Sequence, residues 1–130
     1  MSTDWQAYLE ERICAVVDTR MAAICGLDDG ALLGTFGKDL PRSFTPAEAR
    51  VIIDRLRRGS GEEDIRACGE DYRCLRSGQG VLRGLRGGSP LSVAATEKLL
   101  VVAAAVDGVP ASRLDSAVEA LAADLRAQGT

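Results

Sequence analysis

The side chains that most often carry out catalysis are scarce in this chain of 130 residues. It contains no histidine and only two lysines, Lys38 and Lys98, so a general base would have to be a carboxylate or an activated thiol. Cys14 and Cys25 lie within apolar runs, and only Cys74 has arginines close by in sequence that would favour its thiolate. The sequence therefore predicts a protein that acts by binding, with enzymatic activity as the disfavoured alternative.

A metal site or other cofactor is not expected. The four cysteines show no Cys-x-x-Cys spacing, and no imidazole is available to complete a zinc site. We interpret the cysteines as reduced thiols. A chain of this length buries enough surface to fold without such a staple.

Charge limits the partners that this protein could bind. The 19 acidic and 16 basic residues give a net charge of −3, which argues against a nucleic-acid-binding protein that neutralises phosphates. Within this acidic chain one segment is basic, and its arginines are Arg73, Arg76, Arg83 and Arg86. A phosphoinositide headgroup is one ligand for such a strip, and a solvated strand face is the alternative interpretation.

The elements that position these side chains are organised around residues 98–128. The apolar run 99–106 is rich in β-branched residues and too short to cross a bilayer, which is typical of a central strand covered on both faces. Asp107 and Gly108 turn the chain, and Pro110 suits the first turn of a helix. Apolar residues then recur at three- and four-residue steps, at Leu114, Ala117, Val118, Leu121 and Leu125. This spacing predicts a helix that lies on the sheet.

Two further helices are predicted from their capping residues. Thr3 and Gln6 can form a capping pair for a helix that ends near Asp18. The segment 45–48, Thr-Pro-Ala-Glu, supplies a capping hydroxyl, a proline and a returning glutamate for a helix that runs to about Arg58. The apolar stripe of the first helix would comprise Trp5, Leu9, Ile13 and Val16.

Short strands account for most of the remaining chain. The predicted strands are 21–25, 31–36, 65–67, 72–76, 81–85 and 91–95, and most are separated by glycine-containing turns. With the helices between them, this order fits a single α+β domain over residues 1–130 with an antiparallel sheet. We find neither a charged leader nor an apolar span of about 18 residues, so we expect a cytoplasmic protein without a membrane span.

Six short motifs occur in an order and at a spacing that resembles the profilin family. They are WQAY at 5–8, AAICG at 22–26, TPAE at 45–48, VLRG at 81–84, GGSP at 87–90 and DLRAQG at 124–129. The resemblance covers essentially the whole chain and implies a divergent profilin. It implies a central six- or seven-stranded antiparallel sheet, with the N- and C-terminal helices packed on one face and smaller helices on the other.

The resemblance also implies partners and a location. Profilins bind monomeric actin one to one, proline-rich segments of actin nucleators and, in many members, phosphoinositide headgroups. We therefore expect a monomeric, cytoskeletal regulator of actin assembly. The alternative is a small α+β regulatory module that binds a protein other than actin, such as a GTPase or a coat component.

For proline-rich segments, the resemblance implies a groove between the terminal helices. Aromatic rings line this groove in profilins, and their polar edges donate to the free carbonyls of a polyproline II helix. Trp5 and Tyr8 match the family pattern, whereas the other three positions hold Leu33, Asp124 and Thr130. Because none of these three is aromatic, we expect weakened or absent polyproline binding. The alternative role of Trp5 and Tyr8 is packing between helix and sheet.

For actin, the resemblance implies a contact face on the middle strands and the last helix. Its residues would be Asp71, Cys74, Arg76, Arg83, Leu91, Val118 and Glu119. If residues 77–80 close a hairpin, Arg76 lies opposite Val81, and Arg83 points to the same face. Two guanidinium groups there could grip carboxylates, with a solvated strand face as the alternative. Asp71 stands where the family has a lysine, which reverses one charge.

Overall fold

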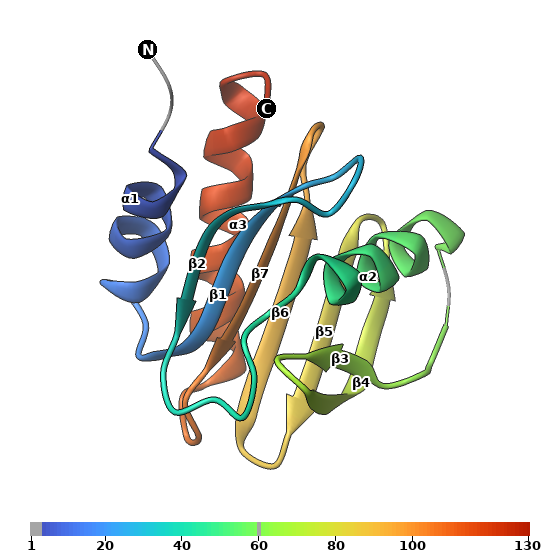
Figure 1. The fold of residues 1–130 in the computed structure, drawn as a ribbon. Coiled ribbons are helices and arrows are strands. Elements are labelled where there is room, and N and C mark those ends of the chain that lie inside the picture. Colours follow the sequence, from blue (N-terminus) through green and yellow to red (C-terminus); the bar gives the residue numbers. More distant parts are fainter. Residues whose placement is uncertain (1–3, 60) are drawn as a thin grey trace.

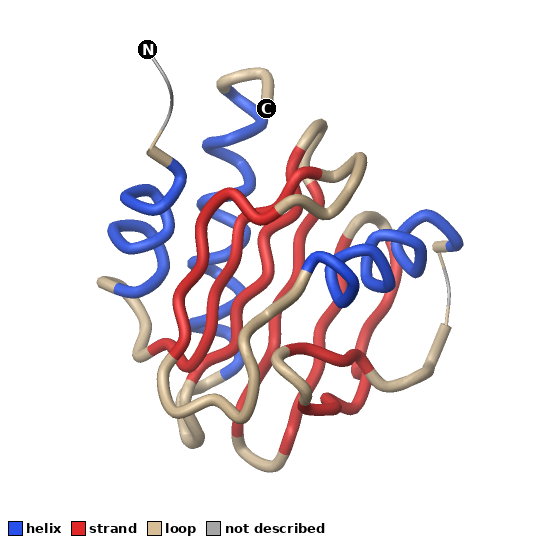
Figure 2. Tube along the Cα trace, viewed as in Figure 1, coloured by secondary structure: helices blue, strands red, loops and turns tan. Residues whose placement is uncertain are grey.

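A computed structural model describes residues 4–59 and 61–130 of the chain. A seven-stranded antiparallel sheet with the order β2-β1-β7-β6-β5-β4-β3 is flanked by helices on both faces (Figure 1). The strands are β1 Thr19–Gly26, β2 Leu32–Gly37, β3 Ile65–Ala67, β4 Glu70–Gly78, β5 Val81–Arg86, β6 Ser89–Ala95 and β7 Leu99–Ala105. The helical elements are α1 Trp5–Leu9, the π-helical turn η1 Glu10–Cys14, α2 Pro46–Arg58 and α3 Ala111–Ala127. The predicted α+β architecture is confirmed (Figure 2).

Strand β7 lies between β1 and β6 and is buried along its whole length. Side chains alternate between the faces of a strand, so its residues enter two separate cores. Leu100 and Val102 enter the core beneath α2, whereas Val101 and Ala103 enter the core beneath α1 and α3. The prediction of a central strand covered on both faces is therefore confirmed.

Helix α3 packs along β6 and β7 through its predicted apolar stripe. All the residues of that stripe are buried: Leu114, Ala117, Val118, Leu121 and Leu125. Pro110 precedes the helix as its N-cap residue instead of occupying its first turn. These contacts hold α3 beside α1, and the opposite side of α3 faces solvent.

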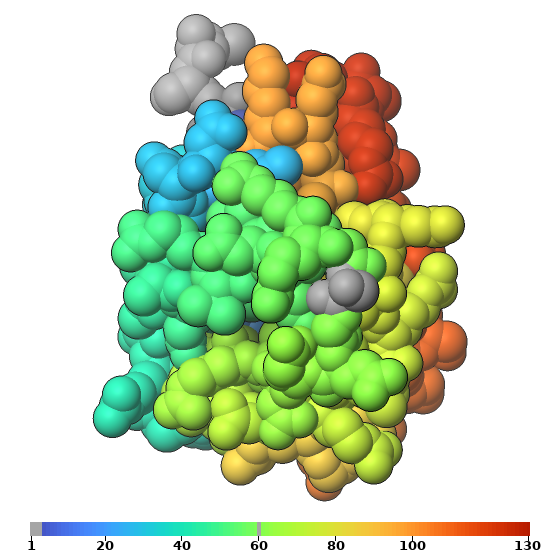
Figure 3. All heavy atoms as spheres, turned by 90° about the vertical axis from the view of Figure 1, so that its right-hand side faces the viewer, coloured from blue at the N-terminus to red at the C-terminus, as the bar shows by residue number. Residues whose placement is uncertain are grey.

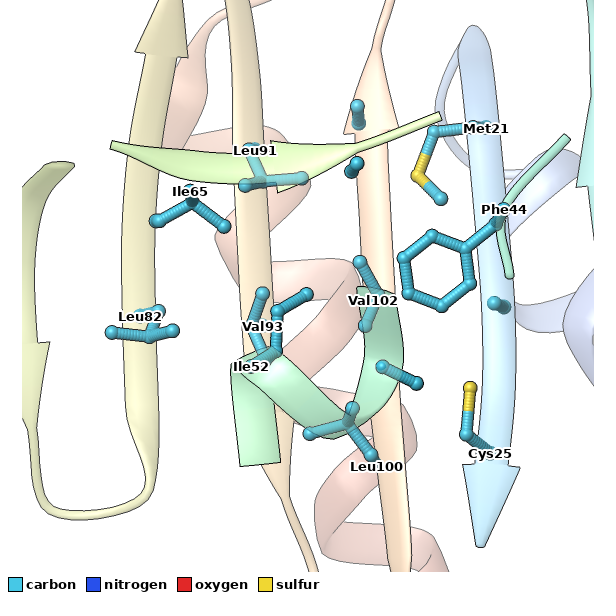
Figure 4. Packing of buried hydrophobic residues seen from close by; sticks show 14 of the residues in the cluster. Met21, Cys25, Phe44, Ile52, Ile65, Leu82, Leu91, Val93, Leu100 and Val102 are labelled. Carbon is cyan, nitrogen blue, oxygen red and sulfur yellow. The ribbon is translucent and has the colours of Figure 1, made fainter. Parts of the chain in front are cut away.

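Helix α2 covers the opposite face of the sheet. Its capping box is present, because Thr45 accepts from the Glu48 backbone at 3.1 Å and Glu48 accepts from the Thr45 backbone at 3.3 Å. Gly59, with φ +75°, ends the helix in the left-handed conformation. Ile52 and Phe44 both belong to the core of this face (Figure 4). From outside, α2 and the segments beside it cover the sheet (Figure 3).

The N-terminal helix is capped differently from the sequence expectation. Thr3 lies outside the described residues, and Asp4 is the N-cap residue, accepting from the Ala7 backbone at 3.1 Å. Gln6 bonds to strand β2 instead of returning to the cap. Its Nε2 donates to the Thr35 carbonyl at 2.7 Å, and its Oε1 accepts from the Thr35 N–H at 3.0 Å. The prediction of a Thr3–Gln6 capping pair is therefore wrong for Gln6.

The predicted apolar stripe of the first helix is wrong at its last residue. Val16 is 54% exposed, whereas Val17 is buried. The reason is the π-helical turn, in which the Ala15 N–H reaches the Glu10 carbonyl at 2.8 Å. A π turn contains an extra residue, so Val17 reaches the sheet in place of Val16.

Candidate functional site

The β4–β5 hairpin decides which charged side chains share a face. It closes with a two-residue turn at Gln79 and Gly80, which have φ values of 56° and 74°. This turn pairs Arg76 with Arg83, so the expected pairing of Arg76 with Val81 is wrong. Directly opposed residues of antiparallel strands lie on the same face. The expectation that Arg76 and Arg83 share a face therefore agrees with the structure, although the register differs.

A bulge at Leu75 puts Arg76 on this face. Cys74 pairs with Gly84 and Arg76 pairs with Arg83, which leaves Leu75 as the extra residue. In a regular strand Cys74 and Arg76 would point to the same side, and the bulge separates them. Cys74 packs against the core beneath α2. The structure therefore does not bring Cys74 together with Arg76 and Arg83, and contact of Cys74 with actin stays a prediction.

Arg83 is buried, and its guanidinium group contacts several neighbouring side chains. It is 8% exposed. Its Nη2 donates to Glu119 Oε1 at 2.6 Å and its Nη1 donates to Ser92 Oγ at 2.5 Å. Its Nε lies 3.1 Å from Asp115 Oδ1. Arg83 therefore connects α3 to the middle of the sheet. The alternative of a solvated strand face is wrong, and contact of Arg83 with actin stays a prediction.

Asp115 belongs to this cluster and was missed by the sequence analysis. Burial raises its pKa above the ordinary value of 3.8, and the positive charge of Arg83 offsets this only in part. Among the described residues, no hydrogen bond of good geometry reaches its buried Oδ1. The spacing of Asp115 and Glu119, four residues apart on the predicted helix, is the signal that could have found it.

Two predicted contact residues, Leu91 and Val118, are buried. Leu91 belongs to the core beneath α2, because its side chain points to the face of β6 opposite Ser92. Val118 belongs to the buried stripe of α3, although Glu119 beside it is exposed. Neither side chain is exposed in this structure, and contact of these two residues with actin stays a prediction.

The charges that remain available on this face are Arg76 and Glu119. Arg76 is exposed, and the Glu119 side chain is 60% exposed even though one of its oxygens is bound by Arg83. Asp71 is also exposed, but it lies near the other end of β4, where Arg66 pairs with it at 3.2 Å. We call the surface formed by Arg76 and Glu119, supported from below by Arg83 and Asp115, the charged face.

The expected basic strip is divided between the two faces of the sheet. Arg73 is exposed on the same face as Arg83, whereas Arg86 is on the other face, where its Nη1 pairs with Glu70 Oε2 at 3.1 Å. Glu70 is buried and also binds Arg20. The four arginines therefore do not form one surface for an anionic headgroup.

A second candidate surface lies on α1. The rings of Trp5 and Tyr8 have centroids 5.9 Å apart and planes tilted by 40°. Both residues are half-buried and pack against the core beneath α1 and α3. They therefore serve the packing role and also leave an aromatic surface in solvent.

Polar side chains connect this aromatic surface to α3. Arg12 Nη2 lies 3.2 Å from Asp124 Oδ2, and the guanidinium carbon of Arg12 lies 5.9 Å from the centre of the Tyr8 ring. Gln128 Nε2 donates to the Tyr8 hydroxyl at 2.9 Å and to Asp124 Oδ2 at 3.1 Å. We call Tyr8, Arg12, Asp124 and Gln128 the polar bridge.

The other two predicted groove residues are placed differently. Leu33 is exposed and is the unpaired residue of a bulge in β2. Thr130 holds the end of α3, because its hydroxyl donates to the Leu125 carbonyl at 2.9 Å and its own carbonyl accepts from the Lys98 N–H at 2.8 Å. Next to Leu33, a β-carbon on Gly34 would lie 3.1 Å from the Trp5 backbone, so glycine there lets α1 sit close to β2.

Three of the four cysteine side chains have a raised pKa. All four cysteines are free, and burial raises the pKa of both Cys25 and Cys68 to about 12. Burial also raises the pKa of Cys14. These three side chains are therefore protonated at neutral pH and are poor nucleophiles.

A sheet with the terminal helices on one face, an aromatic surface and a charged face define a small protein-binding domain. A sequence model of the profilin family matches residues 3–130. The chain therefore belongs to the profilin family. No curated protein sequence matches it. None of the described helices is long and apolar enough to span a membrane.

Solved profilin structures have the same fold. Acanthamoeba castellanii profilin IB superposes with a TM-score of 0.86 at 24% identity, covering 97% of this chain and 99% of that chain. Mouse profilin IIa, solved in complex with a double repeat from the FH1 domain of mDia1, gives 0.77 at 21% identity, covering 98% and 100%. LokiProfilin2, solved in complex with rabbit actin, gives 0.77 at 14% identity, covering 98% and 98%. At these identities the similarity shows the fold.

Proposed function

We propose that this protein binds monomeric actin one to one through the charged face and thereby regulates filament assembly in the cytoplasm, without catalysing a reaction. Family membership supports this proposal, as does the complex of LokiProfilin2 with rabbit actin. The observation that carries it is the exposed pair of Arg76 and Glu119, with Glu119 held in place by Arg83.

The charged face has the chemistry of a protein contact. Arg76 can donate to a partner carboxylate, and the outer part of Glu119 can accept from a partner cation. Because Arg83 fixes one oxygen of Glu119, less side-chain freedom is lost when a partner binds. Exposed charges at such a contact govern recognition and association rate more than folding.

Inhibition of spontaneous pyrene-actin assembly tests this proposal. We expect the wild-type protein to slow assembly in proportion to its concentration, and to co-migrate with monomeric actin at a one-to-one ratio. A failure to slow assembly or to co-migrate at high micromolar concentrations would contradict the proposal. Denatured protein is the control for non-specific effects.

A second partner class, proline-rich segments, is supported by the aromatic surface. Trp5 and Tyr8 offer ring faces for prolines, and mouse profilin IIa was solved with an FH1 double repeat. Leu33, Asp124 and Thr130 supply no ring, so we propose weak binding. Calorimetric titration with decaproline measures it directly, and tight saturation would contradict the weak-binding proposal.

A further inference from the structure

We propose that the polar bridge closes the aromatic surface, and that a proline-rich segment must displace it in order to bind. This inference rests on the proposed binding of proline-rich segments between the terminal helices. The bridge consists of Tyr8, Arg12, Asp124 and Gln128, as defined above. The affinity for a proline-rich segment would then depend on Arg12 and Asp124, two charged residues, although prolines carry no charge.

The bridge joins two segments that are far apart in the sequence. Arg12 in η1 reaches Asp124 in α3, and Tyr8 in α1 reaches Gln128 just beyond α3. Figure 1 shows α1 and α3 side by side, with the start of α1 and the end of α3 both toward the top of the view. A segment that runs between these helices therefore has to cross the bridge.

Within the bridge, the Tyr8 hydroxyl and the Gln128 amide are bonded to each other, and the amide is also bonded to Asp124. Gln128 Nε2 donates to both Tyr8 and Asp124, and the Tyr8 hydroxyl lies 3.3 Å from Gln128 Oε1. A proline-rich segment offers carbonyl acceptors along its prolines and therefore requires free donors. Tyr8 and Gln128 become such donors only when their mutual contact opens.

Arg12 also covers the surface on which a proline would stack. Its guanidinium carbon lies 5.9 Å from the centre of the Tyr8 ring, so it uses one face of that ring. Asp124 holds it there at 3.2 Å. Loss of either charge frees the ring without adding any aromatic group to the site.

The bridge is expected to reduce affinity without abolishing it. The side chains of Arg12 and Asp124 are 47% and 32% exposed, so their ion pair is partly hydrated. Removing an exposed pair of this kind should tighten binding by about two- to fivefold. This gain distinguishes closure from a simple lack of aromatic groups, which predicts no gain.

Calorimetric titration of decaproline into three variants tests the proposal. Arg12→Gln should bind about two- to fivefold tighter than wild type. The matched control is Arg66→Gln, which breaks an ion pair of equal length, 3.2 Å, between β3 and β4. It should leave affinity unchanged. Arg12→Lys keeps a positive charge at this position beside Asp124 and the Tyr8 ring, and should bind with the wild-type affinity.

The outcomes separate this inference from the proposed function. Unchanged or weaker binding by Arg12→Gln, with measurable wild-type binding and an unchanged melting temperature, overturns the closing role. Equal tightening by Arg66→Gln also overturns it, because the effect would then follow net charge. If no variant binds decaproline or a longer proline peptide, the proposed proline-rich partner is wrong, and the closing role is overturned with it.

Discussion

Arg83 of β5 donates to Glu119 of α3 across 2.6 Å, joining residues 36 positions apart. Through this contact, the position of the Glu119 side chain on the charged face depends on Arg83, which is buried. Arg83 and Arg76 therefore have different roles, although they are cross-strand neighbours. Substitutions at the two positions should separate stability from binding.

Arg83→Ala should lower the free energy of unfolding by about 2 kcal/mol or more, because it leaves Asp115 and Glu119 without their cation. Urea denaturation followed by circular dichroism measures this loss. Arg76→Ala is the matched control and should change stability by less than about 0.5 kcal/mol.

Arg76→Glu should weaken inhibition of pyrene-actin assembly while leaving the melting temperature nearly unchanged. The reason is that Arg76 is exposed and its reversed charge would repel the carboxylate that it normally meets. Arg66→Glu reverses an exposed charge on β3, away from the charged face, and should inhibit assembly as the wild type does. Equal inhibition by Arg76→Glu and wild type would remove Arg76 from the interface.

The pKa of Asp115 predicts a pH dependence of stability. Because burial raises this pKa in the folded state, folding favours the protonated carboxyl. The contribution of Asp115 is therefore fully present below its unfolded pKa and is lost as pH rises through the folded value. Relative to wild type, Asp115→Asn should become more stable as pH rises from about 3 to about 7. Urea midpoints across this range measure the difference, and the opposite trend would show that ion pairing dominates.

Wild-type binding to polyproline should be at least tens-fold weaker than a complete aromatic groove provides, since each stacked ring contributes about 1 kcal/mol. The combined variant Leu33→Trp, Asp124→Tyr and Thr130→Tyr should recover part of this affinity. Trp5 fluorescence reports the wild-type titration, and calorimetry suits the variant that contains a second tryptophan. Tight wild-type binding would show that other residues, such as the half-buried Phe36, complete the surface.

The elements with strong local signals were predictable from the sequence. The continuous apolar run that forms β7, the periodic stripe of α3 and the capping box at Thr45 each depend on neighbouring residues. Each was predicted with nearly the observed bounds. Local side-chain chemistry determines these elements, so a single sequence is sufficient to find them.

The charged face was less predictable, because it depends on register. The bulge at Leu75 has no glycine or proline to mark it, and it decides whether Arg76 faces α3 or α2. The π-helical turn likewise exchanges Val16 for Val17 without a clear local signal. Burial of Arg83 follows from the approach of α3 to β5, which is a tertiary contact. Sequence periodicity cannot specify such offsets of one residue.

The bond between Gln6 and strand β2 has a consequence for solubility. Strand β2 is an outer strand of the sheet, and the N–H and C=O of Thr35 point away from β1. Unpaired groups on an outer strand can recruit a strand from another molecule and start aggregation. The Gln6 amide occupies both groups of Thr35 and places α1 against this edge, so a foreign strand cannot pair there without first displacing the helix.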